Sequence, residues 1–472
     1  MAIFKVYTEV VTKSLIILTL SVVFCGSSMG QVPSGQLLPG SRVLIDDTTV
    51  YHDANIPKPG YLQSFIDPIF RTKITRITGD PGTNQGGVTV WGTDARHHYS
   101  LDQAWNADMS MLIISNKEGG SPSPIVLNGE TYQFLRGLPI SGYYDYRWHP
   151  TDPKVIISIS GNKIKRYNFD TNTDVVLHTF SEYSSIDWCS KGKLSWDGKR
   201  TAFRSSDSLN YYAYVYDIET DTKGAVLTMA KDTPEPKPYI SASGKYVIVY
   251  RSDTDTRVYD ANMTYIMELP YNISHYDYAL DANGDDVIVG TYKPSGGGVV
   301  ITQRLRDGHM TTIAPGYSSH TSCTNIRRPG WAYITYMTDW SSYPSYQPYY
   351  MEIVVAKMDG SGEVHRLSHI RHVDSDSDYE TEAHASASPD GKRVIFASTW
   401  NEADGRPVQA YVIDLRDLRP YKEYTDFTDL SIFADWWLNS CTTPSWCEGC
   451  DTDQDTNVNL LDFTVFADYW NP

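Results

Sequence analysis

The stretch that decides the fold is ASPDGKRVIFA, residues 387–397. It opens with a turn made by Pro389, Asp390 and Gly391, and it continues as an apolar run from Val394. Turn residues followed by such a run predict a tight turn and then a buried strand. Six earlier stretches repeat this order of turn and strand, and they are residues 105–115, 148–158, 194–203, 240–249, 280–289 and 325–334.

The repeats are regularly spaced along the chain. Most begin 40 to 48 residues after the one before, and the last gap of about 60 leaves room for an acidic insertion around Asp374–Asp378. A second β run follows most repeats, as at residues 163–169 and 212–218. This regularity predicts small antiparallel sheets repeated around an axis, in preference to another all-β solenoid or a pair of sandwiches.

The repeat resembles that of TolB-like propellers, in which a Ser-Pro-Asp-Gly turn precedes three strands. The resemblance covers about residues 65–418, and it implies seven four-stranded blades around a channel. We therefore expect an all-β fold, a seven-bladed β-propeller over residues 65–420, preceded by an N-terminal segment, residues 31–64. A β run at residues 71–78 has no turn of its own, and we expect it to complete the last blade and close the ring.

Residues that open the inner strands should meet at one mouth of the channel, because these strands converge there. Histidine occurs in four of the seven openings, although the chain has only 12 histidines. The openings are residues 97–99, 143–146, 185–188, 238–239, 275–277, 320–322 and 382–384. The ends of the second strands add Lys117, Arg204, Arg251, Lys293 and Trp400. Each such residue alone is usually structural or solvated, but together they favour a pocket for an anion.

Three of these histidines belong to consecutive predicted blades. They are His275, His320 and His384, and Glu380 and Glu382 stand beside the last of them. Imidazoles combined with a carboxylate suit a divalent transition metal such as manganese.

This arrangement resembles that of oligogalacturonate lyases, which are seven-bladed propellers with a divalent metal at the channel mouth. The resemblance implies that His275 is the base that takes the proton α to the uronate carboxylate. It also implies that His320, His384 and Glu382 are metal ligands, and that Arg251 pairs with the substrate carboxylate.

The implied reaction is β-elimination, in which a neutral histidine takes the acidified proton and the glycosidic oxygen leaves. A tyrosine at the mouth, Tyr144 or Tyr239, would protonate that oxygen. Outside the predicted signal, the sequence contains no Gly-x-Ser-x-Gly motif. Two alternatives stay open: a non-catalytic propeller that binds a glycan or a protein, and a glycoside hydrolase with two carboxylates.

The C-terminal tail contains a second candidate site, the stretch DTDQDTNVNLLD at residues 451–462. Oxygen-bearing side chains fall at its positions 1, 3, 5, 7, 9 and 12, which is the ligand spacing of a twelve-residue calcium loop. The predicted calcium ligands are Asp451, Asp453, Asp455, Asn457 and Asp462. Thr456 stands where such loops usually carry glycine, and the alternative is an acidic solvated turn.

The tail is also duplicated. Residues 426–437 and 459–470 are similar over an offset of 33, and each predicts a helix. The pair resembles the dockerin-like tails of secreted bacterial proteins, over residues 421–472, and implies docking to a cohesin-like partner. The first copy lacks the loop, so we expect one calcium. A disulfide is expected among Cys441, Cys447 and Cys450, with zinc as the alternative.

Composition indicates export. Residues 1–30 are typical of a secretory signal, with an apolar core at 15–24 and small residues before Gln31. Cys25 follows a poor lipobox, which favours cleavage over lipidation. No later stretch predicts a membrane span. The net charge of −17 argues against a nucleic-acid partner. We expect a secreted, cell-surface or periplasmic protein that acts on an acidic polysaccharide or oligosaccharide.

Overall fold

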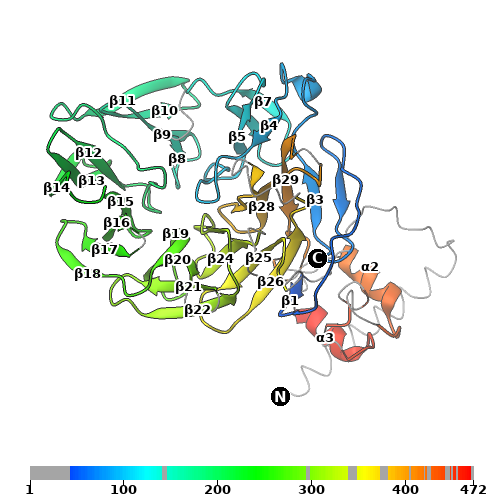
Figure 1. Cartoon of the computed structure of the whole chain (residues 1–472). Helices are drawn as coiled ribbons and strands as arrows, with labels where there is room; N and C mark the ends of the chain where they lie inside the picture. The colour runs from blue at the N-terminus through cyan, green and yellow to red at the C-terminus, as the bar shows by residue number, and fades with distance from the viewer. Residues whose placement is uncertain are drawn as a thin grey trace, which may run out of the picture. The chain divides into compact units, whose positions relative to one another are not determined.

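The computed structural model consists almost entirely of small β-sheets, together with two short α-helices (Figure 1). The structure describes residues 43–140, 146–252, 254–293, 298–337, 348–372, 381–402, 405–418, 420–421, 427–441, 447, 450–452 and 455–468. The predicted signal, Tyr144, Glu380 and Asp453 lie outside these residues. Among the described residues, no helix is both long enough and apolar enough to span a bilayer.

Four sheets are built from strands that follow one another in the sequence. The first contains β8 (Tyr146–Trp148), β9 (Val155–Ser160), β10 (Lys163–Asn168) and β11 (Thr173–Thr179). The second contains β12 (Arg200–Ser206), β13 (Asn210–Asp217) and β14 (Thr222–Ala230). The third contains β15 (Lys237–Ile240), β16 (Tyr246–Ser252), β17 (Asp255–Asp260) and β18 (Tyr265–Glu268). The fourth contains β19 (Ile273–Leu280), β20 (Asp286–Tyr292), β21 (Val299–Arg304) and β22 (Met310–Pro315).

The fifth sheet takes one strand from the N-terminal segment. Its order is β1-β26-β25-β24-β23, and β1 (Leu44–Ile45) lies antiparallel to β26 at its edge. The other strands are β23 (His320–Ser322), β24 (Trp331–Thr335), β25 (Glu352–Lys357) and β26 (Val364–His369).

The sixth and largest sheet brings the two ends of the repeat region together. One group contains β4 (Asp94–Arg96), β5 (Met111–Lys117), β6 (Ile125–Asn128) and β7 (Phe134–Gly137). The other contains β27 (Ser386–Ala387), β28 (Arg393–Ser398), β29 (Val408–Asp414), β3 (Lys73–Arg76) and β2 (Ser64–Ile66). A short parallel pairing of β29 with β4 joins the groups.

Strand β3 closes the arrangement as the sequence predicted. It lies antiparallel to β29, with Ile74 opposite Ile413, so the N-terminal strand completes the group that begins at β27. The sheets follow one another around a common centre (Figure 1). If the largest sheet is divided at its parallel pairing, the described strands form seven groups in chain order. The interpretation of these groups as seven blades stays a prediction.

The repeated turn has the same hydrogen bonds in two of its copies. Gly391 N donates to Ser388 O at 2.8 Å, and Ser388 Oγ donates to Asp390 Oδ1 at 2.6 Å. Gly198 N and Ser195 Oγ make the corresponding bonds, also at 2.8 and 2.6 Å. Gly391 (φ 71°) has the left-handed backbone that glycine adopts without strain. The Ser-x-Asp-Gly pattern is therefore the chemistry of the turn itself.

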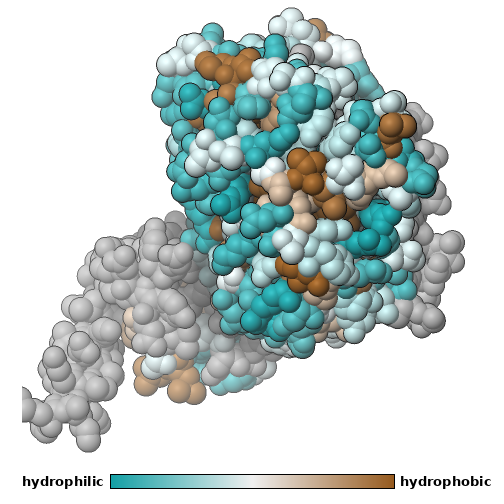
Figure 2. Space-filling model, turned by 90° about the vertical axis from the view of Figure 1, so that its left-hand side faces the viewer, coloured by the Kyte–Doolittle hydropathy of each residue, from teal (hydrophilic) through white to brown (hydrophobic). Residues whose placement is uncertain are grey.

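The apolar runs after the turns are explained by burial on both faces of the sheets. In β28, Val394 and Phe396 enter one core cluster, whereas Ile395 enters another. In β24, Tyr333 and Ile334 likewise face different clusters. A sheet that is covered on both sides has a nearly continuous apolar sequence, and one with a single covered side alternates. The outer surface, in contrast to these buried strands, is polar: Figure 2 shows a mainly hydrophilic face with small separate apolar patches.

The tail forms two helices with a small core. They are α2 (Phe427–Trp436) and α3 (Leu460–Asp468), as predicted for the two copies. Phe433, Val458 and Phe466 are buried together with the tail cysteines. The expected disulfide is present and joins Cys441 to Cys447.

We expect the Ile74→Ala substitution to lower the free energy of unfolding by about 2–5 kcal/mol, because Ile74 is fully buried between the two ends of the ring. Ile266→Ala is the matched control, since Ile266 lies on the outer strand β18 with 38% of its surface exposed. Urea denaturation of both variants checks this. Equal losses of stability would contradict a closing role for β3.

Candidate functional site

Four of the predicted site residues lie together in the structure. The ring centroids of His320 and His384 are 4.2 Å apart, and those of His275 and His320 are 5.4 Å apart. Glu382 Oε2 is hydrogen-bonded to His320 Nε2 and lies 3.4 Å from His384 Nε2. The residues come from β19, β23 and the segment before β27, so the convergence of inner strands brings together positions more than one hundred residues apart.

A β-bulge positions His275. The register between β19 and β20 shifts between Ser274 and Asp277, and His275 within it has a left-handed backbone (φ 51°). The opposite strand makes room with Gly290, where an added Cβ would lie 2.7 Å from Ser274 O and 2.8 Å from Tyr276 Cβ. Bulges turn a side chain out of its regular direction, and here the bulge is possible only because residue 290 has no side chain.

His384 is held through its backbone as well as its ring. Its φ is 45°, and its carbonyl oxygen accepts a hydrogen bond from His97 Nε2. Arg96 Nη1 donates to His384 Nδ1 at 2.9 Å. Because a guanidinium can only donate, Nδ1 is the acceptor and a neutral ring carries its proton on Nε2, facing Glu382. The segment is also fixed to β24, where Ala385 N donates to Thr335 Oγ1 at 3.2 Å.

Burial keeps these imidazoles neutral. Desolvation, together with the positive charges of Lys191 and Arg96, lowers the pKa of His320 to about 3. Desolvation and nearby cations lower the pKa of His275 to about 3 and hold that of His384 well below its usual value. Burial raises the pKa of Glu382 to about 7, although neighbouring cations oppose this. Neutral rings keep a lone pair for a proton or a metal.

The donor set fits a divalent transition metal. One donor atom from each of His320, Glu382 and His384 lies within 4.8 Å of the others, and two imidazoles with a carboxylate are ligands of manganese or zinc. A cation would also compensate the charge of the partly buried Glu382. If His384 binds through Nε2, its proton must move to Nδ1, and Arg96 must then give up its hydrogen bond.

The structure does not bring every predicted residue to this group. Arg251 forms an ion pair with Asp255 at 2.7 Å within its own hairpin. Tyr239 is 1% exposed, and its hydroxyl donates to Cys189 O at 3.1 Å. Its proposed role as an acid stays a prediction, with this hydrogen bond against it. Tyr144 lies in a part of the chain that the structure does not describe.

Sequence reasoning missed two residues near the histidine site, Tyr317 and Lys191. Tyr317 places its hydroxyl 3.4 Å from His275 Nε2, and Lys293 Nζ lies 3.8 Å from the centre of the Tyr317 ring. Lys191 places its ammonium 4.2 Å from the centre of the Tyr276 ring. Tyr317 could have been found from its position three residues before His320. Lys191 could have been found from the SKGK segment, residues 190–193, which lengthens one repeat.

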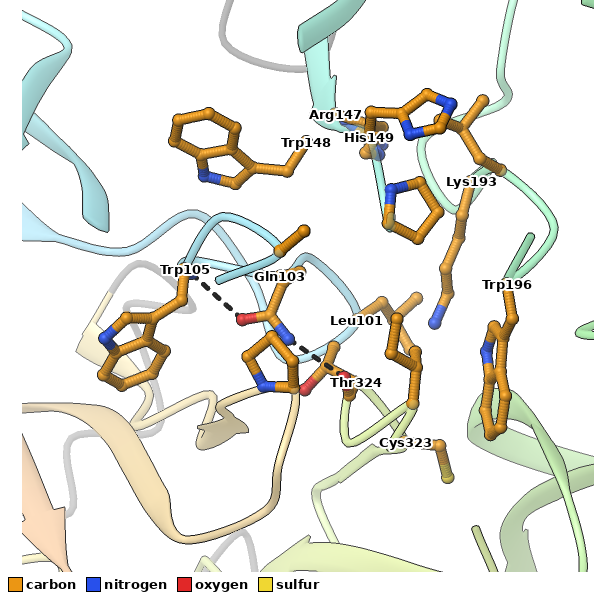
Figure 3. A pocket seen from close by; sticks show the side chains of 15 residues that line it. Leu101, Gln103, Trp105, Arg147, Trp148, His149, Lys193, Trp196, Cys323 and Thr324 are labelled. Carbon is orange, nitrogen blue, oxygen red and sulfur yellow. Dashed lines mark hydrogen bonds between the residues drawn. The ribbon is translucent and has the colours of Figure 1, made fainter. Parts of the chain in front are cut away.

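A separate cavity lies further along the inner strands (Figure 3). Its lining includes Trp105, Trp148, Trp196, Lys193 and Cys323. Two of the lining residues form ion pairs: Lys193 pairs with the fully buried Asp277, and Arg147 Nε lies 3.0 Å from Asp102 Oδ1. None of His275, His320, Glu382 and His384 lines this cavity. The cavity is therefore distinct from the histidine site.

In the described part of the tail loop, two of the predicted calcium ligands are buried and accept backbone hydrogen bonds. Asp451 and Asp462 are fully buried. Asp451 accepts from the N–H groups of Asp455 and Thr456 at 3.1 and 3.0 Å, and Asp462 accepts from Asn459 N at 2.9 Å. Thr456 has φ 80°, the left-handed conformation for which such loops use glycine. Asp453 lies outside the described residues.

Comparison with solved structures shows the fold. The oligogalacturonate lyase of Vibrio parahaemolyticus aligns with a TM-score of 0.57 and 12% identity, over 81% of this chain and 100% of that one. An oligogalacturonate lyase in complex with manganese aligns with a TM-score of 0.54 and 14% identity, over 79% of this chain and 98% of that one. At such identities the likeness establishes a β-propeller fold and nothing further.

Other comparisons add little. TolB from Acinetobacter baumannii aligns over 56% of this chain with a TM-score of 0.33, which is too low to compare the folds. No protein-family profile and no curated protein matches the sequence.

We expect the EDTA-treated protein to bind one equivalent of Mn²⁺ with calcium in excess, because the donor set can hold a single transition metal. The His320→Ala substitution should abolish this binding, and His309→Ala, which alters an exposed histidine, should not. Isothermal titration calorimetry measures both. Unchanged binding in His320→Ala would show that the metal lies elsewhere.

Proposed function

We propose that this protein is an exported lyase that cleaves uronate-containing polysaccharide or oligosaccharide by β-elimination. The observation that carries the proposal is the half-buried, neutral imidazole of His275 beside the donor set of His320, Glu382 and His384. The propeller fold shared with two oligogalacturonate lyases supports it.

His275 is the base. Its low pKa keeps the ring neutral at any pH above about 3, so the base form is always available. The same low pKa makes it a weak base, and elimination therefore requires a more acidic α-proton. A divalent cation held by His320, Glu382 and His384 would supply this by withdrawing electron density from the uronate carboxylate.

Tyr317 is the acid. The C–H bond α to the carboxylate breaks and its proton goes to His275, the electron pair forms the carbon–carbon double bond, and the glycosidic C–O bond breaks. The leaving oxygen takes the phenolic proton of Tyr317. The 3.4 Å contact between Tyr317 and His275 then lets the imidazolium return its proton to the phenolate, which restores both groups.

We expect the His275→Ala substitution to lower the rate of elimination by about 10²–10⁴, because the proton then has no acceptor. Manganese binding should be unchanged, since the cation does not depend on this ring. The rise in absorbance near 235 nm on polygalacturonate or ulvan reports the unsaturated product. The control is His309→Ala, which should keep full activity.

A backbone variant separates the position of His275 from its chemistry. The Gly290→Ala substitution should also lower the rate, because the added methyl group collides with the bulge. Gly284→Ala is the matched control: its φ is 80° but no atom lies within 4 Å, so it should cost stability and leave the rate unchanged. Absence of elimination by the wild type on every uronan tested would favour the glycan- or protein-binding alternative.

The tail is proposed as a calcium-dependent attachment module for a cohesin-like partner. The buried, amide-bonded carboxylates of Asp451 and Asp462 support the calcium loop. The duplicated helices α2 and α3 support the dockerin-like module.

We expect the full-length protein to bind about one calcium through the tail, and Asp451→Asn to remove it. Thr456→Gly should tighten binding about fivefold or more, because glycine relieves a strain of roughly 1–2 kcal/mol at φ 80°. Asp435→Asn, in the first copy, is the control. Calorimetry that gives two tail sites, or none, would contradict the proposal.

A further inference from the structure

The inner edge of the sheet β12–β14 is interrupted by an insertion. Asp187 bridges to Arg204 and Leu194 bridges to Thr201, so the inner segment has four more residues than β12 between the two bridges. We call residues 188–193 the lysine loop, because it carries Lys191 and Lys193. Such an insertion redirects the chain locally, and insertions of this kind are common next to functional sites.

The lysine loop is held in an unfavourable conformation. Cys189 (φ 53°) and Ser190 (φ 66°) are both left-handed without being glycine, which strains the backbone at two successive residues. Two neighbouring sheets hold its backbone: Tyr239 Oη donates to Cys189 O at 3.1 Å, and Arg147 Nε donates to Gly192 O at 2.9 Å. Because hydrogen bonds from both neighbouring sheets hold this strained backbone, we infer that the position of the loop matters for function.

This loop brings Lys191 to the histidine site. Its ammonium lies 4.2 Å from the centre of the Tyr276 ring, next to His275 in the sequence. The positive charge of Lys191 contributes to the lowered pKa of both His275 and His320, which agrees with a location close to both rings. The aromatic face of Tyr276 stabilises the ammonium by a cation–π interaction.

A second lysine approaches His275 from another sheet. Lys293 follows β20, is exposed, and lies 3.8 Å from the centre of the Tyr317 ring. The Tyr317 and His275 ring centroids are 6.1 Å apart, which places the Lys293 ammonium within roughly 10 Å of His275, about one Debye length at 0.1 M salt. Arg251 is paired with Asp255 at 2.7 Å.

We propose that Lys191 and Lys293 form a lysine pair that binds the carboxylates of two neighbouring uronates. Lys191 holds the carboxylate of the reacting sugar, and Lys293 holds that of its neighbour. The assignment of the reacting sugar rests on the proposed function; the recognition of two carboxylates does not. In a chain of net charge −17, such local cations are what a polyanionic sugar requires.

The test compares trigalacturonate with its fully methyl-esterified form, which lacks the negative charges. Binding is measured by calorimetry on the His275→Ala background, and turnover is measured at 235 nm on the active enzyme. Lys191→Gln and Lys293→Gln should each weaken binding of trigalacturonate about 10- to 100-fold and raise KM, because each loses one ionic hydrogen bond. Neither substitution should weaken binding of the methyl ester relative to the unsubstituted lysines, because the ester has no carboxylate for a lysine to bind. Lys245→Gln, at an exposed turn, is the control.

The Tyr239→Phe substitution tests whether the hydrogen bond from Tyr239 to Cys189 O holds the lysine loop in place. If Tyr239 positions Lys191, this variant should raise KM as Lys191→Gln does and leave kcat unchanged, whereas loss of an acid would lower kcat.

The outcomes separate the two proposals. Turnover with unchanged KM in both lysine variants would overturn the lysine pair and leave the lyase. Lysine-dependent binding without turnover by the wild type would support the lysine pair and overturn the lyase. Equal effects of the lysine variants on the acid and the ester, or no binding of trigalacturonate, would also overturn the lysine pair.

Discussion

The desolvation of three imidazoles beside one carboxylate, with His320 and His384 buried and His275 and Glu382 partly buried, is the constraint on which the rest of the site depends. Desolvation disfavours the charged form of each group. It lowers the pKa values of His275, His320 and His384, so these rings stay neutral and keep their lone pairs, and it raises the pKa of Glu382. Such a group can accept a proton or a cation. Arg96 already places one positive charge on His384 Nδ1, and a metal would have to displace that hydrogen bond.

Left-handed non-glycine residues occur in many parts of the described chain, and some of them present a functional group. His275 and His384 are left-handed within the histidine site, Cys189 and Ser190 are left-handed in the lysine loop, and Thr456 is left-handed in the tail loop. Several repeat turns use glycine at this position, as at Gly391, although the first repeat has Met109 at φ 63°. Non-glycine residues in this conformation persist only where surrounding contacts hold them, such as the space at Gly290 or the bond from Tyr239 to Cys189.

Much of the fold could be predicted from the sequence because the repeats carry their own turn chemistry and apolar strands. The closing strand at Ile74 and the convergence of His275, His320 and His384 followed from topology alone. The roles of individual side chains were harder to predict, because hydrogen bonds between different sheets leave no periodic pattern in the sequence. Tyr239 donates to a loop of another sheet, and Lys191 reaches the site only through an insertion. The pairing of Arg251 with Asp255, four residues later, was visible in the sequence.

The central claim is elimination at a uronate by a neutral histidine, and the masses of the products test it most directly. Elimination adds no water, so the two fragments of an oligouronate should together have the mass of the substrate. The fragment that carries the original non-reducing end should be saturated. Mass spectrometry of oligogalacturonate incubated with the manganese-loaded wild type should show this balance. Fragments that together exceed the substrate by one water would identify a hydrolase and contradict the account.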